Sequence, residues 1–444
     1  MSKAIFGTDG VRGLVGAGPM TVDFAMRLAS AAAQVLAPDG GTVVIGKDTR
    51  LSGYMFESAL EAGFVAAGVD VLLIGPLPTP GIAHLTQKFK ADLGVVISAS
   101  HNLYDDNGIK FFDRYGSKLN DDVQRQIEAK LESPAITRES SALGKAKRID
   151  TARILYQEFC ASTFPEDLRL DGVKVVFDGA NGAGYKVGPR TLANIGAEVI
   201  PIGCSPNGRN INDGCGSTSP ELLQLTVPAL KADVGVALDG DGDRVVMVDE
   251  SGNLVDGDQL LYILATAGKQ DGSLKGPVVG TVMSNLGLEH ALIAEKIEFR
   301  RASVGDRYVL ETLKETGGVI GGETSGHMIM LDHVTTGDGL ICALQVLAVM
   351  KRTGKPLSEL VAGMSKYPQT MVNVRTDKRL DPDKSAAIQD AVTAAEGELA
   401  DTGRVVLRAS GTEPVIRVMV EGQDEDQVVT LAKRLAEVVA EAAA

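Results

Sequence analysis

Residues 91–100 read ADLGVVISAS, and residues 232–241 read ADVGVALDGD. In both segments an apolar run typical of a buried strand stops abruptly at a polar loop. When the two segments are aligned, Ser100 falls opposite Asp241. Residues 317–326, GGVIGGETSG, form a third and weaker copy. An earlier strand precedes each copy in its own third of the chain, and these strands are expected at Thr42–Gly46, Val173–Asp178 and Pro277–Thr281. Three related α/β domains are the economical explanation.

Segments of helical period alternate with these strands over the first 365 residues, for example Thr21–Leu36 and Val187–Ile195. This alternation predicts α/β domains with mixed or parallel sheets, whose polar loops gather at the carboxyl ends of strands around one central cleft. The last 75 residues instead predict a smaller C-terminal α+β domain, in the order strand, helix, two strands and helix. Boundaries near Asp150, Leu254 and Pro368 divide the chain into residues 1–150, 151–254, 255–367 and 368–444.

The amino-acid composition argues against some classes of function. The 444 residues carry 44 Lys and Arg against 58 Asp and Glu, a net charge of −14. Such a balance argues against nucleic acid or an anionic membrane as a partner. No apolar stretch has the length of a signal peptide or a membrane helix, and the four cysteines lack metal-site spacing. We therefore expect a cytoplasmic protein with reduced thiols.

The sharpest single motif is LDGDGDR at Leu238–Arg244. Asp239, Asp241 and Asp243 alternate with glycines, so the three carboxylates can converge on one hard cation. An EF-hand calcium loop is a poor match, because Arg244 stands where that loop requires glycine and the flanks read as strands. Magnesium is the favoured interpretation, and a solvated acidic turn is the alternative.

The stretch VVISASHNLYDDNGIK, Val95–Lys110, places Ser100 and His101 directly after a strand, with Lys110 nine residues further on. A hydroxyl beside a histidine and a cation suits a covalent intermediate. Serine, asparagine, aspartate and glycine are also the ordinary residues of turns, so this stretch alone favours a plain loop.

Two later loops carry binding groups. In RASGTEPVIR, two guanidinium groups flank hydroxyls and free backbone amides, a combination that suits a phosphate. The residues are Arg408, Ser410, Gly411, Thr412 and Arg417. A simple turn is the alternative. In GGETSGH, Glu323 and Ser325 suit sugar hydroxyls, and His327 suits orienting a group or handling protons. The glycines of Asp178–Gly184 lack dinucleotide-site spacing and read as turn and packing residues.

Five motifs together resemble the α-D-phosphohexomutase family, and the resemblance covers all four predicted domains. They are FGTDGVRG at Phe6–Gly13, SASHN at Ser98–Asn102, DGDGDR at Asp239–Arg244, GGETSGH at Gly321–His327 and RASGTEP at Arg408–Pro414. The resemblance implies an intramolecular phosphotransferase with four loops in order: the catalytic serine loop, the metal loop, the sugar loop and the phosphate loop.

The resemblance also implies the chemistry. Ser100 would carry a phosphoryl group, with one Mg²⁺ held by a phosphate oxygen and the three aspartates. Arg12, Lys110 and Arg244 would balance this negative charge, and Lys110, Arg12 and His101 are candidates for proton transfer. A hexose or hexosamine 1,6-bisphosphate would be both intermediate and activator, and a homodimer is implied.

The segments FGTDGVRG, VGDRYV at Val304–Val309 and RASGTEPVIRVMVEG at Arg408–Gly422 favour the branch that interconverts glucosamine 6-phosphate and glucosamine 1-phosphate. Asp306 falls where relatives acting on glucose or mannose phosphates usually have histidine, and its carboxylate is hypothesised to accommodate an ammonium group. Three alternatives stay open: a glucose or mannose phosphate mutase on the same scaffold, a metal-dependent phosphatase, and a non-catalytic sugar-phosphate sensor.

Overall fold

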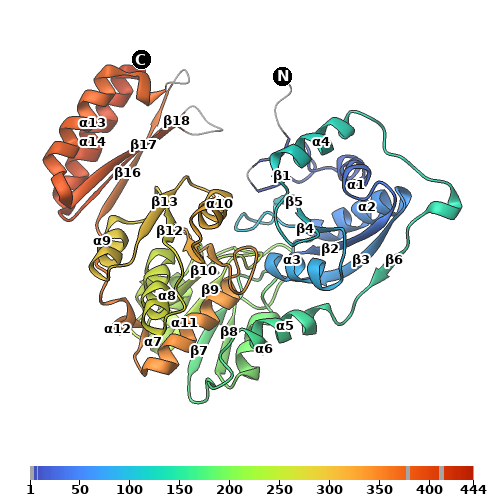
Figure 1. Cartoon of the computed structure of the whole chain (residues 1–444), viewed down its shortest axis with the longest axis horizontal. Helices are drawn as coiled ribbons and strands as arrows, with labels where there is room; N and C mark the ends of the chain where they lie inside the picture. Colours follow the sequence, from blue (N-terminus) through green and yellow to red (C-terminus); the bar gives the residue numbers. More distant parts are fainter. Residues whose placement is uncertain (1–4, 8, 377–380, 410–414, 444) are drawn as a thin grey trace.

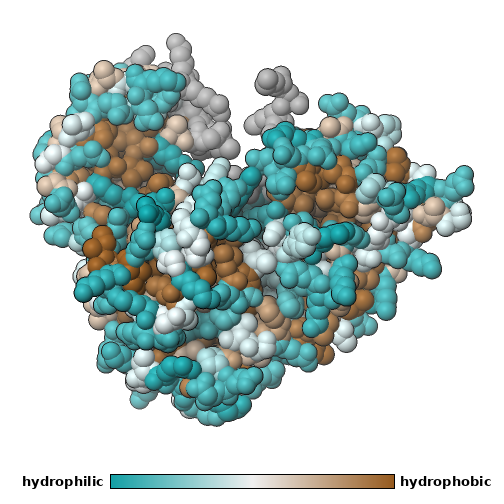
Figure 2. Space-filling view, in the orientation of Figure 1, coloured by the Kyte–Doolittle hydropathy of each residue, from teal (hydrophilic) through white to brown (hydrophobic). Residues whose placement is uncertain are grey.

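The computed structural model describes residues 5–7, 9–376, 381–409 and 415–443. The N-terminal domain lies to the right in Figure 1, the C-terminal domain to the upper left, and the green and yellow middle domains lie between them. Figure 2 shows the molecular surface notched between the two outer domains. In the part of the chain that is described, no helix is both long and apolar enough to cross a membrane.

The N-terminal sheet has six strands in the order β1-β5-β4-β2-β3-β6. The strands are β1 (Val11–Leu14), β2 (Gly41–Lys47), β3 (Val69–Pro76), β4 (Leu93–Ile97), β5 (Asp106–Asp113) and β6 (Ala146–Arg148). Its helices are α1 (Val22–Leu36), α2 (Ser52–Ala66), α3 (Thr79–Lys88) and α4 (Asp121–Leu131). Strand residues alternate between the two faces: Val43 and Ile45 pack in the core that contains α1 and α2, and Val44 packs in the core that contains α3.

The second domain has the sheet order β11-β10-β9-β7-β8. Its elements are α5 (Ala152–Ser162), β7 (Lys174–Asp178), α6 (Val187–Asn194), β8 (Glu198–Ile202), α7 (Glu221–Ala229), β9 (Val234–Leu238), β10 (Val245–Val248) and β11 (Leu254–Val255). Because β11 pairs with β10, this sheet extends one residue past the predicted boundary at Leu254. The domain boundaries themselves remain predictions.

The third domain has the order β13-β12-β14-β15. Its elements are α8 (Gly257–Asp271), β12 (Val278–Thr281), α9 (Leu286–Ala294), β13 (Phe299–Ala302), α10 (Asp306–Thr316), β14 (Ile320–Gly322), β15 (Met328–Met330), α11 (Gly339–Thr353) and α12 (Leu357–Val361).

The three sheets repeat one arrangement. Each contains three parallel strands plus one antiparallel neighbour, in the orders β5-β4-β2-β3, β10-β9-β7-β8 and β15-β14-β12-β13. The strands of the sequence repeat, β4, β9 and β14, occupy the same place in each sheet. The predicted fold class of three related α/β domains and a smaller C-terminal domain is confirmed.

The C-terminal domain contains an antiparallel sheet, β16-β18-β17, and two helices. Its elements are β16 (Gln369–Arg375), α13 (Ala386–Leu399), β17 (Gly403–Ala409), β18 (Val415–Gly422) and α14 (Glu425–Ala443). A continuous apolar core joins the first three domains, running from Phe112 through Tyr156 and Phe177 to Leu344. The C-terminal domain has a core of its own, which includes Ile388, Val418 and Leu431.

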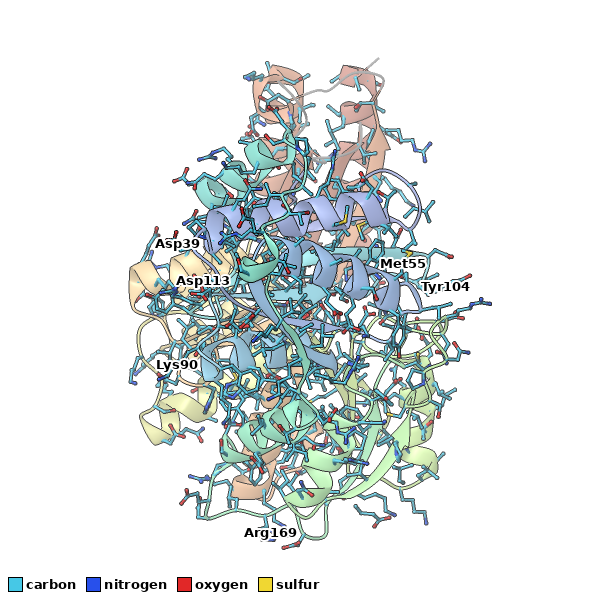
Figure 3. All side chains as sticks on the ribbon, turned by 90° about the vertical axis from the view of Figure 1, so that its right-hand side faces the viewer. Asp39, Met55, Lys90, Tyr104, Asp113 and Arg169 are labelled. Carbon is cyan, nitrogen blue, oxygen red and sulfur yellow. The ribbon has the colours of Figure 1, made fainter. Side chains whose placement is uncertain are left out.

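The outer face of the N-terminal domain carries exposed large side chains. Figure 3 shows Met55 of α2 and Tyr104 of the loop after β4 near the same edge of this face. Both are about two-fifths exposed, at 38% and 40%. The loop that carries Ser100 therefore turns from the interior to the surface within four residues.

Candidate active site

Ser100 lies directly beyond β4, and its side chain is buried against the second domain. The Ser100 hydroxyl donates to Asp239 Oδ2 at 2.6 Å, and His101 Nδ1 lies 3.4 Å from Ser100 Oγ. The Ser100 backbone is in the left-handed region, with φ of 50°. The two loops that the sequence repeat matched are thus in direct contact across a domain boundary.

Asp239, Asp241 and Asp243 occupy the tight turn between β9 and β10, and all three are buried. One carboxylate oxygen from each lies within 4.8 Å of the others. Asp241 Oδ1 and Asp243 Oδ1 are buried without a hydrogen-bond partner among the described residues. Unpartnered, convergent carboxylate oxygens are what a hard divalent cation requires, so this cluster can hold a metal ion.

Two groups of the N-terminal domain hold the middle aspartate. Asp241 Oδ2 accepts from the Lys110 ammonium at 2.9 Å and from the Thr79 hydroxyl at 2.8 Å. The Thr79 amide also donates to the Asp241 carbonyl at 2.8 Å. Lys110 is 2% exposed and also pairs with Asp9 Oδ2 at 2.9 Å. Lys110, predicted from its position in the serine loop, therefore bridges that loop's domain to the metal loop.

The electrostatics of the cluster are uneven. Burial, followed by the charges of Asp243 and Asp241, raises the pKa of Asp239 well above its ordinary value. Burial opposes ionisation of Asp241 too, but Lys110 outweighs it and lowers the pKa of Asp241. Burial and then Arg244 and Arg12 lower the pKa of His101 to about 4. Burial is therefore the largest influence on these three groups, and Lys110 is the cation that keeps Asp241 ionised.

Arg12 and Arg244 flank the site from opposite domains. Arg12 on β1 pairs with Asp9. Arg244 follows the aspartates, with its Nε 3.9 Å from Asp243 Oδ1. Burial would lower the pKa of Arg244, but Asp243 and Asp239 raise it. The catalytic roles of both arginines remain predictions, and no role was predicted for Asp9, which pairs with Arg12 and Lys110.

The sugar loop adjoins the metal loop. The Val245 amide donates to the Gly326 carbonyl at 3.1 Å, and Arg244 and His327 form an antiparallel bridge. Glu323 Oε1 accepts from the Gly305 amide at 3.0 Å, and the Ser325 hydroxyl lies 3.5 Å from Glu323 Oε2. The structure therefore brings the predicted sugar-binding residues next to the aspartate cluster.

Asp306 begins α10, and both of its oxygens have partners. Oδ2 accepts from Lys118 Nζ at 2.6 Å and lies 3.5 Å from His327 Nε2, while Oδ1 accepts from the Arg307 amide at 2.8 Å. Asp243 and Asp306 outweigh burial and raise the pKa of His327 to about 9. Lys118, which sequence reasoning missed, also pairs with Asp9 at 2.6 Å.

The two arginines of the predicted phosphate loop lie on the C-terminal sheet. Arg408 on β17 and Arg417 on β18 are exposed and face each other as register partners. Ser410, Gly411 and Thr412 lie outside the described residues. Figure 1 places β17 and β18 apart from β4, on the opposite side of the notch.

Two further residues that sequence reasoning missed hold the serine loop. Arg50 and Asn212 both donate to the carbonyls of Ser100 and Asn102. No motif signals them, because an arginine after a strand and an asparagine in a loop are common. Their partners are backbone atoms that only the fold brings within reach.

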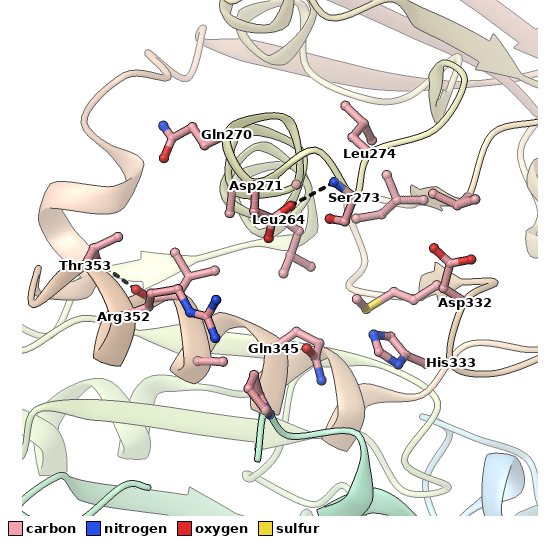
Figure 4. Close-up of a pocket in the computed structure, with 18 residues that line it drawn as sticks. Leu264, Gln270, Asp271, Ser273, Leu274, Asp332, His333, Gln345, Arg352 and Thr353 are labelled. Atoms are coloured by element: carbon pink, nitrogen blue, oxygen red, sulfur yellow. Dashed lines mark hydrogen bonds between the residues drawn. The ribbon is translucent and has the colours of Figure 1, made fainter. Parts of the chain in front are cut away.

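A separate cavity of about 530 Å³ lies between α8, β14, β15 and α11 (Figure 4). Two of its polar side chains already have partners: Asp271 accepts from the Ser273 amide at 2.9 Å, and Gln345 donates to the Thr163 carbonyl at 2.9 Å. None of the predicted site residues lines it. The convergent chemistry therefore lies at the serine and aspartate loops.

The chain matches family models for all four domains of phosphoglucomutase/phosphomannomutase. Domains I, II and III match residues 3–137, 155–252 and 256–367, and the C-terminal domain matches residues 371–438.

Among curated proteins, phosphoglucosamine mutase 1 of Shewanella amazonensis is 55% identical over 438 residues, covering 98% of both chains. Phosphoglucosamine mutase of Aeromonas hydrophila is 56% identical over 440 residues, covering 99% of both chains.

Solved structures share the fold. A phosphoglucomutase/phosphomannomutase family protein from Burkholderia thailandensis has a TM-score of 0.81 at 25% identity, covering 99% of this chain and 98% of that one. Aspergillus fumigatus N-acetylphosphoglucosamine mutase, in complex with GlcNAc-6P and magnesium, has a TM-score of 0.71 at 18% identity, covering 99% and 96%. With 55% identity over its full length to curated members, the chain belongs to the phosphoglucomutase/phosphomannomutase family, as an intramolecular phosphotransferase.

Proposed function

We propose that this enzyme interconverts glucosamine 6-phosphate and glucosamine 1-phosphate through a phosphorylated Ser100. One observation carries the proposal: the Ser100 hydroxyl lies 2.6 Å from Asp239 in a buried cluster of three carboxylates. A serine held against such a cluster suits phosphoryl transfer better than acyl transfer, because acyl transfer has no use for three buried acids. The full-length similarity to phosphoglucosamine mutases supports the amino sugar as substrate.

In the first half-reaction, the sugar O1 hydroxyl attacks the phosphorus of phospho-Ser100. The bond from Oγ to phosphorus breaks, the bond from O1 to phosphorus forms, and the O1 proton leaves to a base. His101 Nδ1, 3.4 Å from Ser100 Oγ, lies within reach to exchange a proton at that oxygen. Lys110 and Arg244 stabilise the negative charge on the transferring group.

The second half-reaction returns the other phosphate. The 1,6-bisphosphate turns within the cleft, the bond from O6 to phosphorus breaks, and Ser100 Oγ regains a phosphoryl group while O6 takes a proton. Asp239, Asp241, Asp243 and a phosphate oxygen on Ser100 would hold one Mg²⁺. That ion would act as a Lewis acid, offsetting charge on the phosphoryl oxygens.

The remaining predicted residues bind substrate in this proposal. Glu323 and Ser325 bind ring hydroxyls, and His327 carries positive charge beside them. Asp306 is assigned to the amino group, which would share this carboxylate with Lys118. The C-terminal loop holds the non-reacting phosphate through Arg408, Ser410, Gly411, Thr412 and Arg417. A hexosamine or hexose 1,6-bisphosphate would prime Ser100, and a cytoplasmic homodimer completes the proposal.

Replacing Ser100 with alanine tests the mechanism. The Ser100→Ala enzyme should lose roughly 10³-fold or more of its mutase rate, since no phosphoryl carrier remains. Peptide mass spectrometry of the wild type should find one phosphoryl group on the peptide containing Ser100. The control Ser162→Ala removes an exposed helix hydroxyl that bonds only to the Phe159 carbonyl and should be fully active.

An unphosphorylated Ser100 peptide together with undiminished activity of Ser100→Ala would refute the mechanism. Comparing glucosamine, glucose and mannose phosphates separately tests the substrate assignment. A higher kcat/KM for glucose or mannose phosphate would make the enzyme a mutase of those sugars. Release of inorganic phosphate without isomerised product would make it a phosphatase.

A further inference from the structure

Two side chains from different domains bind the same pair of backbone carbonyls around Ser100. Asn212 Nδ2 donates to the Ser100 carbonyl at 2.8 Å and to the Asn102 carbonyl at 2.9 Å. Arg50 donates to the same two oxygens, at 3.3 Å for Ser100, from a guanidinium that is 0% exposed. Each carbonyl thus accepts from both the N-terminal and the second domain.

This double attachment coincides with backbone strain. Ser100 adopts φ of 50°, a left-handed conformation that is unfavourable for residues other than glycine. Reversal of this conformation would redirect the Ser100 side chain away from Asp239. Ser98 holds the loop from the other side, since its hydroxyl accepts from the Ser100 amide at 2.9 Å and donates to Asp48 at 2.6 Å. Asp48 in turn pairs with Arg50.

Asn212 also lies against the metal loop. A Cβ added at Gly240, between Asp239 and Asp241, would lie 2.6 Å from both Asn212 Nδ2 and the Ser100 carbonyl oxygen. Glycine is therefore required there. Because it has no side chain, the Asn212 amide and the Ser100 carbonyl can pack directly against the metal loop. The position of the serine relative to the aspartates is set at this contact.

We propose that Asn212, together with Arg50, is a positioning residue for phosphoryl transfer. It fixes the Ser100 backbone so that Oγ faces the aspartate cluster, and it does not touch the substrate. This inference rests on the proposed role of Ser100. It predicts that loss of the Asn212 donor slows transfer to and from Ser100 while substrate binding elsewhere in the cleft is preserved.

The test compares two variants of Asn212. Asn212→Asp keeps the shape and the tolerance for its own left-handed φ of 58°, but it sets a carboxylate against two carbonyls. Asn212→Gly keeps the backbone conformation and removes the donor without adding repulsion. We expect kcat to fall roughly 10- to 100-fold in Asn212→Asp and less in Asn212→Gly, with KM within about threefold of wild type. Ser100 phosphorylation by added glucose 1,6-bisphosphate should slow in parallel.

Thr49→Val is the matched control, because the Thr49 hydroxyl crosses the same domain interface to the Asn181 carbonyl without touching the serine loop. Its kcat should match wild type after rates are normalised to the folded fraction from thermal melts. If the Asn212 variants then also match Thr49→Val, or lose activity through KM alone, the positioning role is wrong. Failure of the underlying mechanism is seen separately, as an active Ser100→Ala enzyme.

Discussion

The two regions proposed to bind phosphate differ in how they are held in the structure. Ser100 and the three aspartates are buried, joined across domains by Lys110, Thr79 and Asn212, and they lie beside the apolar core shared by three domains. Arg408 and Arg417 are exposed on a domain with its own core. Reacting groups need fixed geometry, whereas groups that hold two different phosphates in turn tolerate a separate body.

The connection between these regions is polar. Glu421 of β18 is fully buried, pairs with Arg404 and accepts from the Leu286 amide at 3.1 Å. Arg404 donates to the Ser284 carbonyl at 2.7 Å, and the Asn285 side chain donates to Glu421 Oε2 at 3.4 Å. Hydrogen bonds and a buried acid thus connect the C-terminal domain to the third domain.

The largest effect should come from the fixed region. Asp239→Asn keeps the side-chain shape but removes a predicted metal ligand and the acceptor for Ser100, so kcat should fall roughly 10³-fold with little change in KM. Steady-state kinetics at saturating Mg²⁺ measure this. Asp249→Asn, a buried acid that bonds only within its own turn, is the control and should stay near wild type. A normal kcat for Asp239→Asn would show that the cluster is structural.

A pH effect of intermediate size is expected at the junction. Burial and then Asp256 raise the pKa of Asp258 to about 6, although the Asn285 amide and Thr324 hydroxyl donate to it. Because burial favours the neutral acid in the folded state, the contribution of Asp258 to stability is fully present below about pH 4 and is lost as pH rises through 6, by up to about 3 kcal/mol.

Urea unfolding of wild type and Asp258→Asn between pH 4 and 7 measures this difference. The free energy of unfolding of the variant should rise relative to that of the wild type as pH rises, because its amide cannot ionise. Asp332→Asn, an exposed acid of the same domain, should leave the profile unchanged. If the free energies of unfolding of wild type and Asp258→Asn changed in parallel with pH, the predicted titration of Asp258 would be wrong.

The smallest effect should come from the exposed region. Arg417→Ala removes one charge-assisted donor from the C-terminal loop and should raise KM for the sugar phosphate about tenfold, with kcat little changed. Arg434→Ala is the control, because it removes only an exposed ion pair between Arg434 of α14 and Glu398 of α13. An equal fall in kcat and kcat/KM for Arg417→Ala would show that this arginine stabilises the transition state. The two regions would then not differ in the way proposed.

Much of the fold was predictable because its signals are local. The β4, β9 and β14 strands were found from apolar runs that stop at polar loops, and their equivalence is confirmed by identical positions in three sheets. The ends of the helices were less predictable: α13 begins at Ala386 only after a short 3₁₀ turn at Pro382–Lys384. Helix ends depend on capping geometry, which periodicity does not report.

The candidate site was predictable to the extent that its residues share a motif. Asp239, Asp241 and Asp243 converge as expected because alternate glycines bend one short turn. Lys118 was missed because its partners, Asp9 and Asp306, are 109 and 188 residues away. Pairing over such distances leaves no spacing in the sequence to detect.

The amino-acid sequence by itself determined three repeated α/β units, a distinct C-terminal domain and an acidic turn matched with a serine loop. These follow from periodicity, glycine placement and charge, which are properties of neighbouring residues. Only the tertiary structure decided that Ser100 takes a left-handed backbone, that Asn212 and Arg50 bind its carbonyl, and that both Asp306 oxygens are paired. Those features depend on atoms that meet only when the domains pack, because hydrogen bonds require contact distances that no local pattern encodes.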